Sequence, residues 1–203
     1  MNRVRGRIDA LARSLHPLDT RLEDIPVHGY QPPAGAAWRP RAAAVLIPIL
    51  DRDEPEILLT VRSRHLPRHA GQVSLPGGGR QDGEDFPLQT ALRETAEEVG
   101  IGSAHIQPLG LLDRFDTITG YRMVPVVALI HGNPEPVPCP SEVDSVFGLP
   151  WKTVVCPDSY RRHHVTRGRH RWELISMATT PRLVWGATAA ILMQLSAACP
   201  ENG

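Results

Sequence analysis

The chain has few cysteines, few aromatic residues and no excess of either charge. Its 203 residues include 3 cysteines, 5% aromatic residues, and 22 basic against 22 acidic side chains. Cys139, Cys156 and Cys199 are widely spaced without a Cys-x-x-Cys pair, which argues against a disulfide framework or a zinc site and favours a reducing compartment. The balanced charge creates no overall field for nucleic acid, so any attraction for anions must be local.

Long apolar runs and internal repeats are also missing. No segment reaches membrane-spanning length, and the basic residues 1–7 are not followed by the apolar core of a signal peptide. We therefore expect a cytoplasmic protein whose partner is a small molecule, not a nucleic acid or a membrane. The length fits one domain with appendages. We expect an N-terminal helix and connecting arm over 1–38, the main domain over 39–199 and a short tail over 200–203.

Hydrophobic periodicity predicts elements of both kinds. Residues 3–15 fit an amphipathic helix, and the proline-rich residues 17–40 fit a connecting arm. The apolar side of that helix carries Val4, Ile8, Leu11 and Leu15. β-prone runs predict adjacent strands over 42–50 and 56–62 and another over 124–130. A closing helix is expected over 183–197, with Trp185, Ile191, Leu192 and Leu195 suited to packing.

The most informative segment joins a glycine loop to an acidic helix. Glu94, Glu97 and Glu98 have the spacing that projects side chains to one side of a helix. Like charges placed together destabilise the helix and one another, so the cluster favours a bound cation. Oxygen-only ligands suit Mg²⁺ or Mn²⁺. The alternative is an ordinary solvated acidic face.

The helix itself is well bounded, over about 86–99. Asp85 fits an N-cap, with Pro87 in the first turn, and Gly100 fits a left-handed C-terminal position. The predicted buried stripe is Leu88, Leu92, Ala96 and Val99, with the three glutamates off it. The glycines of residues 77–79 come from a preceding strand, and their missing side chains let the backbone approach a metal or a phosphate.

This segment resembles the signature of the Nudix hydrolases: Gly, five residues, Glu, seven residues, then Arg-Glu-aliphatic-x-Glu-Glu-x-Gly-aliphatic. The matching positions are Gly79, Asp85, Arg93, Glu94, Glu97, Glu98, Gly100 and Ile101. Asp85 replaces the first glutamate and could cap the helix or orient Arg93. Thr95 replaces the bulky aliphatic residue. The resemblance implies an α/β/α sandwich with a mixed sheet between helices.

It also implies metal-assisted hydrolysis of a diphosphate linked to a nucleoside. Glu94 and Glu98 would be direct ligands, Glu97 a direct or water-mediated ligand, and the Gly79 carbonyl could complete the shell. Arg93 would orient the acidic face, although it could also be an ordinary surface ion-pair residue. The general base would be Glu94 or Glu142, and Glu142 is equally well explained as a charge at the start of a helix.

A second stretch is similar to the coenzyme A pyrophosphatase branch of the same family. It runs from Leu58 to Ser63 and from His65 to Gly78, and residues 185–188 resemble the closing helix of that branch. Two positions differ: Leu75 replaces the usual Phe, and a basic residue common near Pro67 is absent. The implied substrate is coenzyme A or acyl-coenzyme A, cut to 3′,5′-ADP and the phosphopantetheine product.

The residues of this stretch that could bind substrate phosphates are Arg62, Arg68, His69, Gly77 and Gly78. Alternatively, the basic ones belong to an ordinary polar strand end and loop. Another nucleoside diphosphate derivative such as ADP-ribose is the nearest alternative substrate. A noncatalytic nucleotide-binding sensor is the alternative of a different class, since a fold alone does not establish function.

One basic segment stands apart from these motifs. Its members are Arg161, Arg162, His163, His164, Arg167, Arg169, His170 and Arg171. They could hold a 3′-phosphorylated nucleotide, form the exposed face of a hairpin around Gly168, or bind RNA. No aromatic residue lies within the segment, and only Tyr160 and Trp172 adjoin its two ends, which disfavours RNA.

Overall fold

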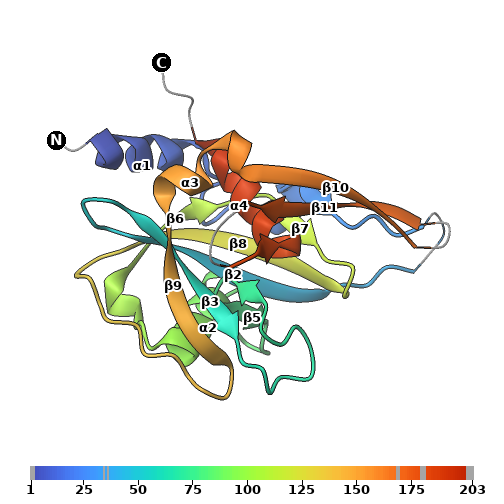
Figure 1. Ribbon diagram of the computed structural model, residues 1–203, viewed down its shortest axis with the longest axis horizontal. Coiled ribbons are helices and arrows are strands. Elements are labelled where there is room, and N and C mark those ends of the chain that lie inside the picture. The colour runs from blue at the N-terminus through green and yellow to red at the C-terminus, as the bar shows by residue number, and fades with distance from the viewer. Residues whose placement is uncertain (1–2, 34, 36, 168–169, 179–181, 200–203) are drawn as a thin grey trace.

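A computed structural model of the protein describes residues 3–33, 35, 37–167, 170–178 and 182–199 (Figure 1). The helices are α1 (Arg3–Ser14), α2 (Leu88–Val99), α3 (Trp151–Val154) and α4 (Gly186–Ala198), with short 3₁₀ turns at Leu22–Asp24, Ser103–His105 and Pro157–Ser159. The strands are β1 (Val27–Gly29), β2 (Arg41–Leu50), β3 (Glu56–Arg62), β4 (Val73–Ser74), β5 (Gly77–Gly79), β6 (Ile106–Leu111), β7 (Arg114–Asp116), β8 (Tyr121–Ile130), β9 (Val143–Pro150), β10 (Tyr160–Arg167), β11 (His170–Met177) and β12 (Val184–Trp185).

The main sheet is mixed and is built on the parallel pair β2 and β8. These strands stay in register along their whole length, from Arg41 opposite Tyr121 to Leu50 opposite Ile130. Their long apolar runs are typical of strands that are covered on both faces. The sheet path is β1-β7-β8-β2-β3-β4, while β5 pairs with β2, β6 with β8, and β9 with β3.

Successive residues of β2 enter two different cores, because side chains alternate across a strand. Val45, Ile47 and Ile49 pack in the core that also contains residues of α1 and α4. Ala44 and Leu46 pack in the core that contains residues of α2. In Figure 1, α1, α3 and α4 lie above the sheet and α2 lies below it. The expected α/β/α sandwich with a mixed sheet is therefore confirmed.

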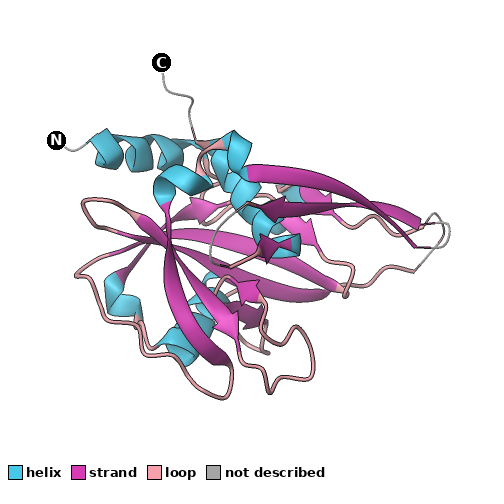
Figure 2. Cartoon of the chain, viewed as in Figure 1, coloured by secondary structure: helices cyan, strands magenta, loops and turns pink. Residues whose placement is uncertain are grey.

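A small second sheet projects from one end of the molecule, as Figure 2 shows. It has the order β10-β11-β12, and β10 and β11 form an antiparallel hairpin. The hairpin expected in the basic segment is thus present, although residues 168 and 169 lie outside the described chain. Among the described residues, no helix combines the length and apolar character needed to cross a membrane.

Most predicted elements are confirmed, with shifts at their ends. The strand expected over 56–62 has those bounds, and the one expected over 42–50 begins at Arg41. The closing helix begins at Gly186, not at residue 183, because Val184 and Trp185 first add a strand to the small sheet. Trp185 is consequently 37% exposed, so the expectation that it packs in the core was wrong.

Helix α1 contributes to the same core as the sheet. Ile8, Leu11 and Leu15 are buried, as the periodicity predicted, whereas the side chain of Val4 lies outside the described part. These residues share a core cluster with Ile191 and Leu195 of α4. Residues before position 39 therefore help to stabilise the folded unit, although the domain boundary at 38/39 stays a prediction.

We predict that Leu11→Ala lowers the free energy of unfolding by about 2–5 kcal/mol, because it removes a fully buried side chain and leaves a cavity. Leu11 is 0% exposed, whereas Leu18, just beyond α1, is 39% exposed and provides a matched control. Leu18→Ala should cost about 0.5 kcal/mol or less. Denaturant unfolding of both variants measures the difference. Equal, small losses would mean that α1 does not pack as described.

Candidate metal and substrate site

Helix α2 carries the acidic residues, and its ends differ in how well they were predicted. Gly100 ends the helix with a φ of 70°, a left-handed conformation suited to glycine, as expected. The start of the helix differs from the prediction. The N-cap position is Pro87, and Asp85 makes no side-chain cap, so that assignment was wrong. Instead the Asp85 backbone N–H donates to the side-chain oxygen of Gln89 at 2.8 Å.

The buried face of α2 also differs from the predicted stripe. Ala96 is exposed, and the buried residues are Thr90, Ala91, Thr95, Glu98 and Val99. Thr95 fits this face because its hydroxyl donates to the Ala91 carbonyl at 2.7 Å. The expectation that all three glutamates lie off the buried stripe was wrong for Glu98. The helix packs beside β5, where the Gly77 backbone N–H donates to the Glu98 carboxylate. A rule based on apolar periodicity does not consider such a donor.

The structure brings Glu94 and Glu98 together with Glu142, from a distant part of the chain. One carboxylate oxygen from each of these three residues lies within 4.8 Å of the others. Glu98 is only 2% exposed, and one of its oxygens accepts a hydrogen bond from the Gly77 backbone N–H at 3.2 Å. This donor set, made only of oxygens, fits a hard divalent cation.

The glycines of β5 make this close arrangement possible. A Cβ atom on Gly78 would lie 2.3 Å from an oxygen of Glu94, and one on Gly77 would lie 2.4 Å from the Ala44 carbonyl oxygen. Gly77 also has a φ of 155°. A larger residue at position 78 would displace the Glu94 carboxylate, and one at position 77 would push β5 away from the backbone of β2. The glycine strand is therefore part of the site's geometry.

Burial disfavours the charged form of these carboxylates. It raises the pKa of Glu98 to about 7, and the nearby Glu94 and Glu142 carboxylates add to the increase, while the Gly77 N–H and Arg62 oppose it. Burial also raises the pKa of Glu94, with further contributions from Glu97 and Glu142. A bound cation would remove this cost by favouring the deprotonated forms.

Glu142 reaches the site because its loop is attached to the end of α2. The Cys139 N–H donates to the Glu98 carbonyl at 2.9 Å, and the Ser63 N–H donates to the Glu142 carbonyl at 2.8 Å. Glu142 directly precedes β9, so the alternative of a charge at a helix start was wrong. No local sequence signal marks Glu142 as a partner of the acidic helix. Tertiary structure alone places it there.

Arg93 lies beside the cluster and organises its acidic neighbours. Its Nε donates to Glu84 at 2.6 Å, and its Nη1 donates to both Glu94 and Glu97 at 2.9 Å. Its Nη2 donates to the Gly79 carbonyl at 3.1 Å. Glu97, whose side chain is 53% exposed, thus pairs with Arg93 and is not among the three clustered carboxylates.

The sequence interpretation missed Glu84, which takes the place suggested for Asp85 as the partner of Arg93. Glu84 is buried, and it also accepts hydrogen bonds from the Thr90 hydroxyl, at 2.5 Å, and from the Gln81 N–H. The hydrogen bond from Arg93 lowers the pKa of Glu84 to about 2. Five residues separate Gly78 from Glu84, which is the signature spacing counted from Gly78 instead of Gly79, and this one-residue offset could have drawn attention to Glu84.

An open cleft of about 1570 Å³ extends from the carboxylate cluster. Arg62, Arg68, His69, Gly77, Gly78 and Gly79 all line it, as do Glu94, Glu97, Glu98 and Glu142. Arg62 is a second basic residue beside the cluster, after Arg93, with its Nη1 3.9 Å from a Glu98 oxygen. Its Nε is buried and has no hydrogen-bond partner among the described residues.

The other end of the cleft is lined by side chains of the small sheet and α4. They include Trp172, Ile175, Trp185, Ala187, Ile191 and Met193. Of the basic segment, Arg162 also lines the cleft, but it pairs with Glu173. His163 bonds to Ser176, and Arg161 donates to backbone carbonyls. The side chains of Arg167, Arg169, His170 and Arg171 lie outside the described part of the chain.

The fold and the carboxylate cluster together are typical of a metal-dependent hydrolase. Residues 39–166 match the family model described as the NUDIX domain. The chain is 38% identical over 156 residues to a protein of Pectobacterium atrosepticum named uncharacterized Nudix hydrolase NudL, covering 77% of this chain and 81% of the relative. The protein of that name in Escherichia coli K12 is 37% identical with the same coverage.

This chain therefore belongs to the Nudix hydrolase family, whose members typically use a divalent metal. Among solved structures, a MutT/nudix family protein from Enterococcus faecalis has a TM-score of 0.50 at 18% identity. The similarity covers 82% of this chain and 63% of that one, and it concerns the fold alone.

The metal-free chain should lose stability as pH rises, because its folded state holds the Glu98 proton more tightly than its unfolded state does. The pKa of Glu98 rises from 4.5 to about 7 on folding. The stabilisation is complete below pH 4.5 and decreases until about pH 7, by about 3 kcal/mol at most. Glu98→Gln should show a smaller decrease, because only the raised pKa of Glu94 then contributes. Melting curves between pH 5 and pH 8 in chelator measure it.

The exposed Glu135 supplies a control, since Glu135→Gln should keep the wild-type pH profile. Adding Mg²⁺ or Mn²⁺ at pH 8 should raise the melting temperature of wild type and of this control, because a ligand that binds the folded state stabilises that state. The melting temperature of Glu98→Gln should rise much less. Identical pH profiles and identical metal responses in all three proteins would contradict the assignment of Glu98.

Proposed function

We propose that this protein hydrolyses the diphosphate bond of coenzyme A or acyl-coenzyme A with the help of Mg²⁺ or Mn²⁺. The products would be 3′,5′-ADP and phosphopantetheine or its acyl derivative. The observation that carries the proposal is the convergence of the Glu94, Glu98 and Glu142 carboxylates beside the glycine strand, within one cleft that also contains Arg62. The similarity of residues 58–78 to the coenzyme A branch supports the substrate.

Glu94 and Glu98 would hold the metal, and Glu142 would complete the set of carboxylates. When bound, the metal would neutralise the diphosphate oxygens and acidify the attacking water. Glu97 could contribute through a water molecule, since it lines the cleft outside the cluster. In the structure, the Gly79 carbonyl accepts a hydrogen bond from Arg93, and its second lone pair could still serve a metal.

The remaining residues position the substrate and move a proton. Arg62, Arg68 and His69 all line the cleft and could donate hydrogen bonds to diphosphate oxygens. Arg93 would act by holding Glu94 in place. The proton of the attacking water would pass to Glu94 or to Glu142, because both carboxylates lie beside the expected reaction centre.

The lining of the cleft suits a substrate with one charged part and one apolar part. The carboxylates and arginines lie near β5, while tryptophan and aliphatic side chains line the part beneath α4. A diphosphate at the first end would direct the pantetheine arm and an acyl chain toward the second. We further propose that the protein acts in the cytoplasm on this small-molecule substrate, without a nucleic-acid or membrane partner.

Product analysis tests the substrate class. Purified protein with Mg²⁺ or Mn²⁺ should cleave acyl-coenzyme A to 3′,5′-ADP and the matching acyl-phosphopantetheine, leaving the thioester intact. In ¹⁸O-labelled water, one labelled oxygen should appear in a phosphate product, because water attacks phosphorus. Mass spectrometry measures both. Efficient cleavage of ADP-ribose with inert coenzyme A would reject the substrate, and binding without any turnover would favour the sensor.

Glu98→Gln should reduce kcat by about 10²- to 10³-fold, because it removes one buried electrostatic stabiliser while keeping the side-chain shape. Glu135→Gln, which lies away from the cleft lining, is the matched control and should turn over normally. Steady-state hydrolysis is paired with melting curves. Near-normal turnover of Glu98→Gln at saturating Mg²⁺ would refute its role as a ligand.

A further inference from the structure

A second, smaller pocket of about 510 Å³ lies next to the glycine strand. It is lined by Arg41, Ala42, Gly79, Arg80, Asp82, Gly83 and Tyr121. Gly79 and Tyr121 also line the main cleft, so the two cavities adjoin at these residues. Its volume is within the range of small-molecule sites, about 300–1,000 Å³. None of its residues except Gly79 has a role in the proposed reaction.

Two arginines of this pocket are held by aromatic rings. The Arg41 guanidinium lies 4.2 Å from the centre of the Tyr121 ring, and Arg41 and Tyr121 are neighbours at the start of β2 and β8. The Arg80 guanidinium lies 5.5 Å from the centre of the Phe86 ring. Stacking on a ring face orients a guanidinium without using its N–H donors.

Most N–H donors of Arg41 and Arg80 are therefore available to a ligand. Within the described chain, neither Arg41 nor Arg80 forms an ion pair with a carboxylate, and Arg80 makes only a long hydrogen bond of 3.4 Å to the Glu84 carbonyl. By contrast, the guanidinium of Arg93 is engaged by carboxylates. Two oriented guanidinium groups with free donors are well suited to a phosphate group, which accepts several charge-assisted hydrogen bonds.

We propose that Arg41 and Arg80 bind a phosphate monoester at the nucleoside end of the substrate. This inference rests on the proposed function, under which that group is the 3′-phosphate of coenzyme A. The diphosphate would lie at the carboxylate cluster, and the nucleotide would extend past Gly79 into the small pocket. The pantetheine arm would extend the other way, toward the apolar part of the cleft.

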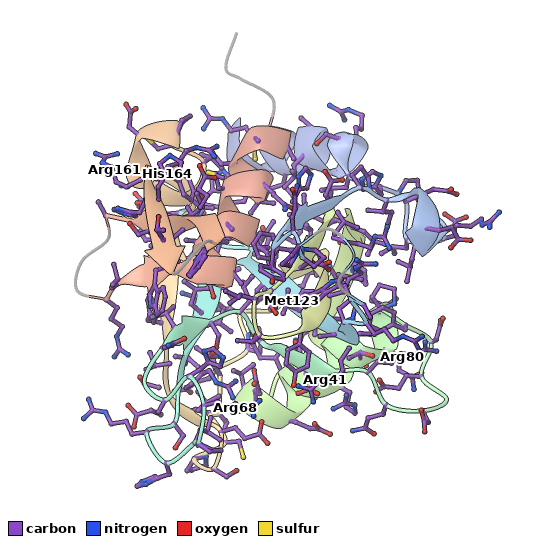
Figure 3. The ribbon with its side chains drawn as sticks, turned by 90° about the vertical axis from the view of Figure 1, so that its right-hand side faces the viewer. Arg41, Arg68, Arg80, Met123, Arg161 and His164 are labelled. Atoms are coloured by element: carbon purple, nitrogen blue, oxygen red, sulfur yellow. The ribbon has the colours of Figure 1, made fainter. Side chains whose placement is uncertain are left out.

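The basic hairpin β10-β11 is a less suitable site in its described part. Arg162 already pairs with Glu173, and Arg161 donates to the Asp158 and Tyr160 carbonyls. Figure 3 shows Arg41 and Arg80 close together on one face, while Arg161 and His164 lie at the far end of the same view. Arg41 and Arg80, unlike Arg161 and Arg162, adjoin the glycine strand of the metal site.

Coenzyme A and dephospho-coenzyme A differ only in the 3′-phosphate, so comparing them isolates this contact. The double variant Arg41→Gln/Arg80→Gln should lower kcat/KM for coenzyme A about tenfold to a hundredfold, as expected for lost hydrogen bonds to a charged group. Its kcat/KM for dephospho-coenzyme A should change by less than about twofold. Melting curves of the same proteins verify folding, and each single variant should show part of the effect.

Two control variants separate this contact from general charge effects. Arg52→Gln removes an exposed arginine outside both cavities and should affect neither substrate. Arg162→Gln tests the hairpin and should affect the two substrates equally. Equal losses on both substrates in the double variant, or a selective loss only in Arg162→Gln, would overturn the inference.

A binding measurement keeps the inference testable if coenzyme A is not the substrate. Calorimetry compares 3′,5′-ADP with 5′-AMP, which lacks the 3′-phosphate, on wild type and on the double variant. A wild-type preference for 3′,5′-ADP that disappears in the double variant supports the site, even where both coenzyme A forms stay uncleaved and the proposed function fails. No preference in wild type, or one that the double variant retains, refutes it.

Discussion

The burial of Glu98 beside two other carboxylates is the constraint on which the site depends. A carboxylate that is 2% exposed and close to Glu94 and Glu142 is costly to ionise. The chain supplies only partial compensation, through one backbone N–H of Gly77 and the more distant Arg62. A divalent cation would supply the rest, so this incomplete compensation is itself an argument for a metal site.

Each part of the fold near this site serves to bring those oxygens together. The buried face of α2 fixes Glu98 against the sheet, and the glycines of β5 allow Glu94 to approach the backbone. The hydrogen bond from Cys139 to the end of α2 attaches the loop that carries Glu142. Because β5 pairs with the central strand β2, the site is attached to one of the most buried parts of the sheet.

What the sequence could predict was local. The spacing of the glutamates indicated one helical side, and Gly100 indicated where the helix ends. Periodicity also located β2 and β3. The sequence could not show that Glu142 lies at the site, because its proximity to Glu98 depends on how the loop before β9 packs against α2. Glu84 was missed because the signature was aligned on Gly79, and Asp85 then occupied the acidic position.

The predicted buried stripe holds at Leu88, Leu92 and Val99 but failed at Ala96 and Glu98, for a related reason. Apolar periodicity assumes that a helix buries its hydrophobic side, yet α2 exposes Ala96 and buries Glu98. A polar group can be buried when donors are prepared for it, and the glycine strand provides one. The departure from the simple rule therefore coincides with the functional site, as is expected where function overrides local preference.

The arginines around the cleft differ in how their donors are used, and this difference separates positioning from binding. All three nitrogens of Arg93 donate to groups of the protein, so its guanidinium holds the acidic face and has little capacity left for a ligand. Arg62 keeps a buried Nε without a partner among the described residues. Arg41 is oriented by a ring, not by a carboxylate.

A protein that only needed positive charge near its metal could pair every arginine, whereas one that binds an anion must leave donors unpaired where the anion lies. By that criterion, Arg62 faces the diphosphate we propose and Arg41 faces the phosphate we propose beyond it.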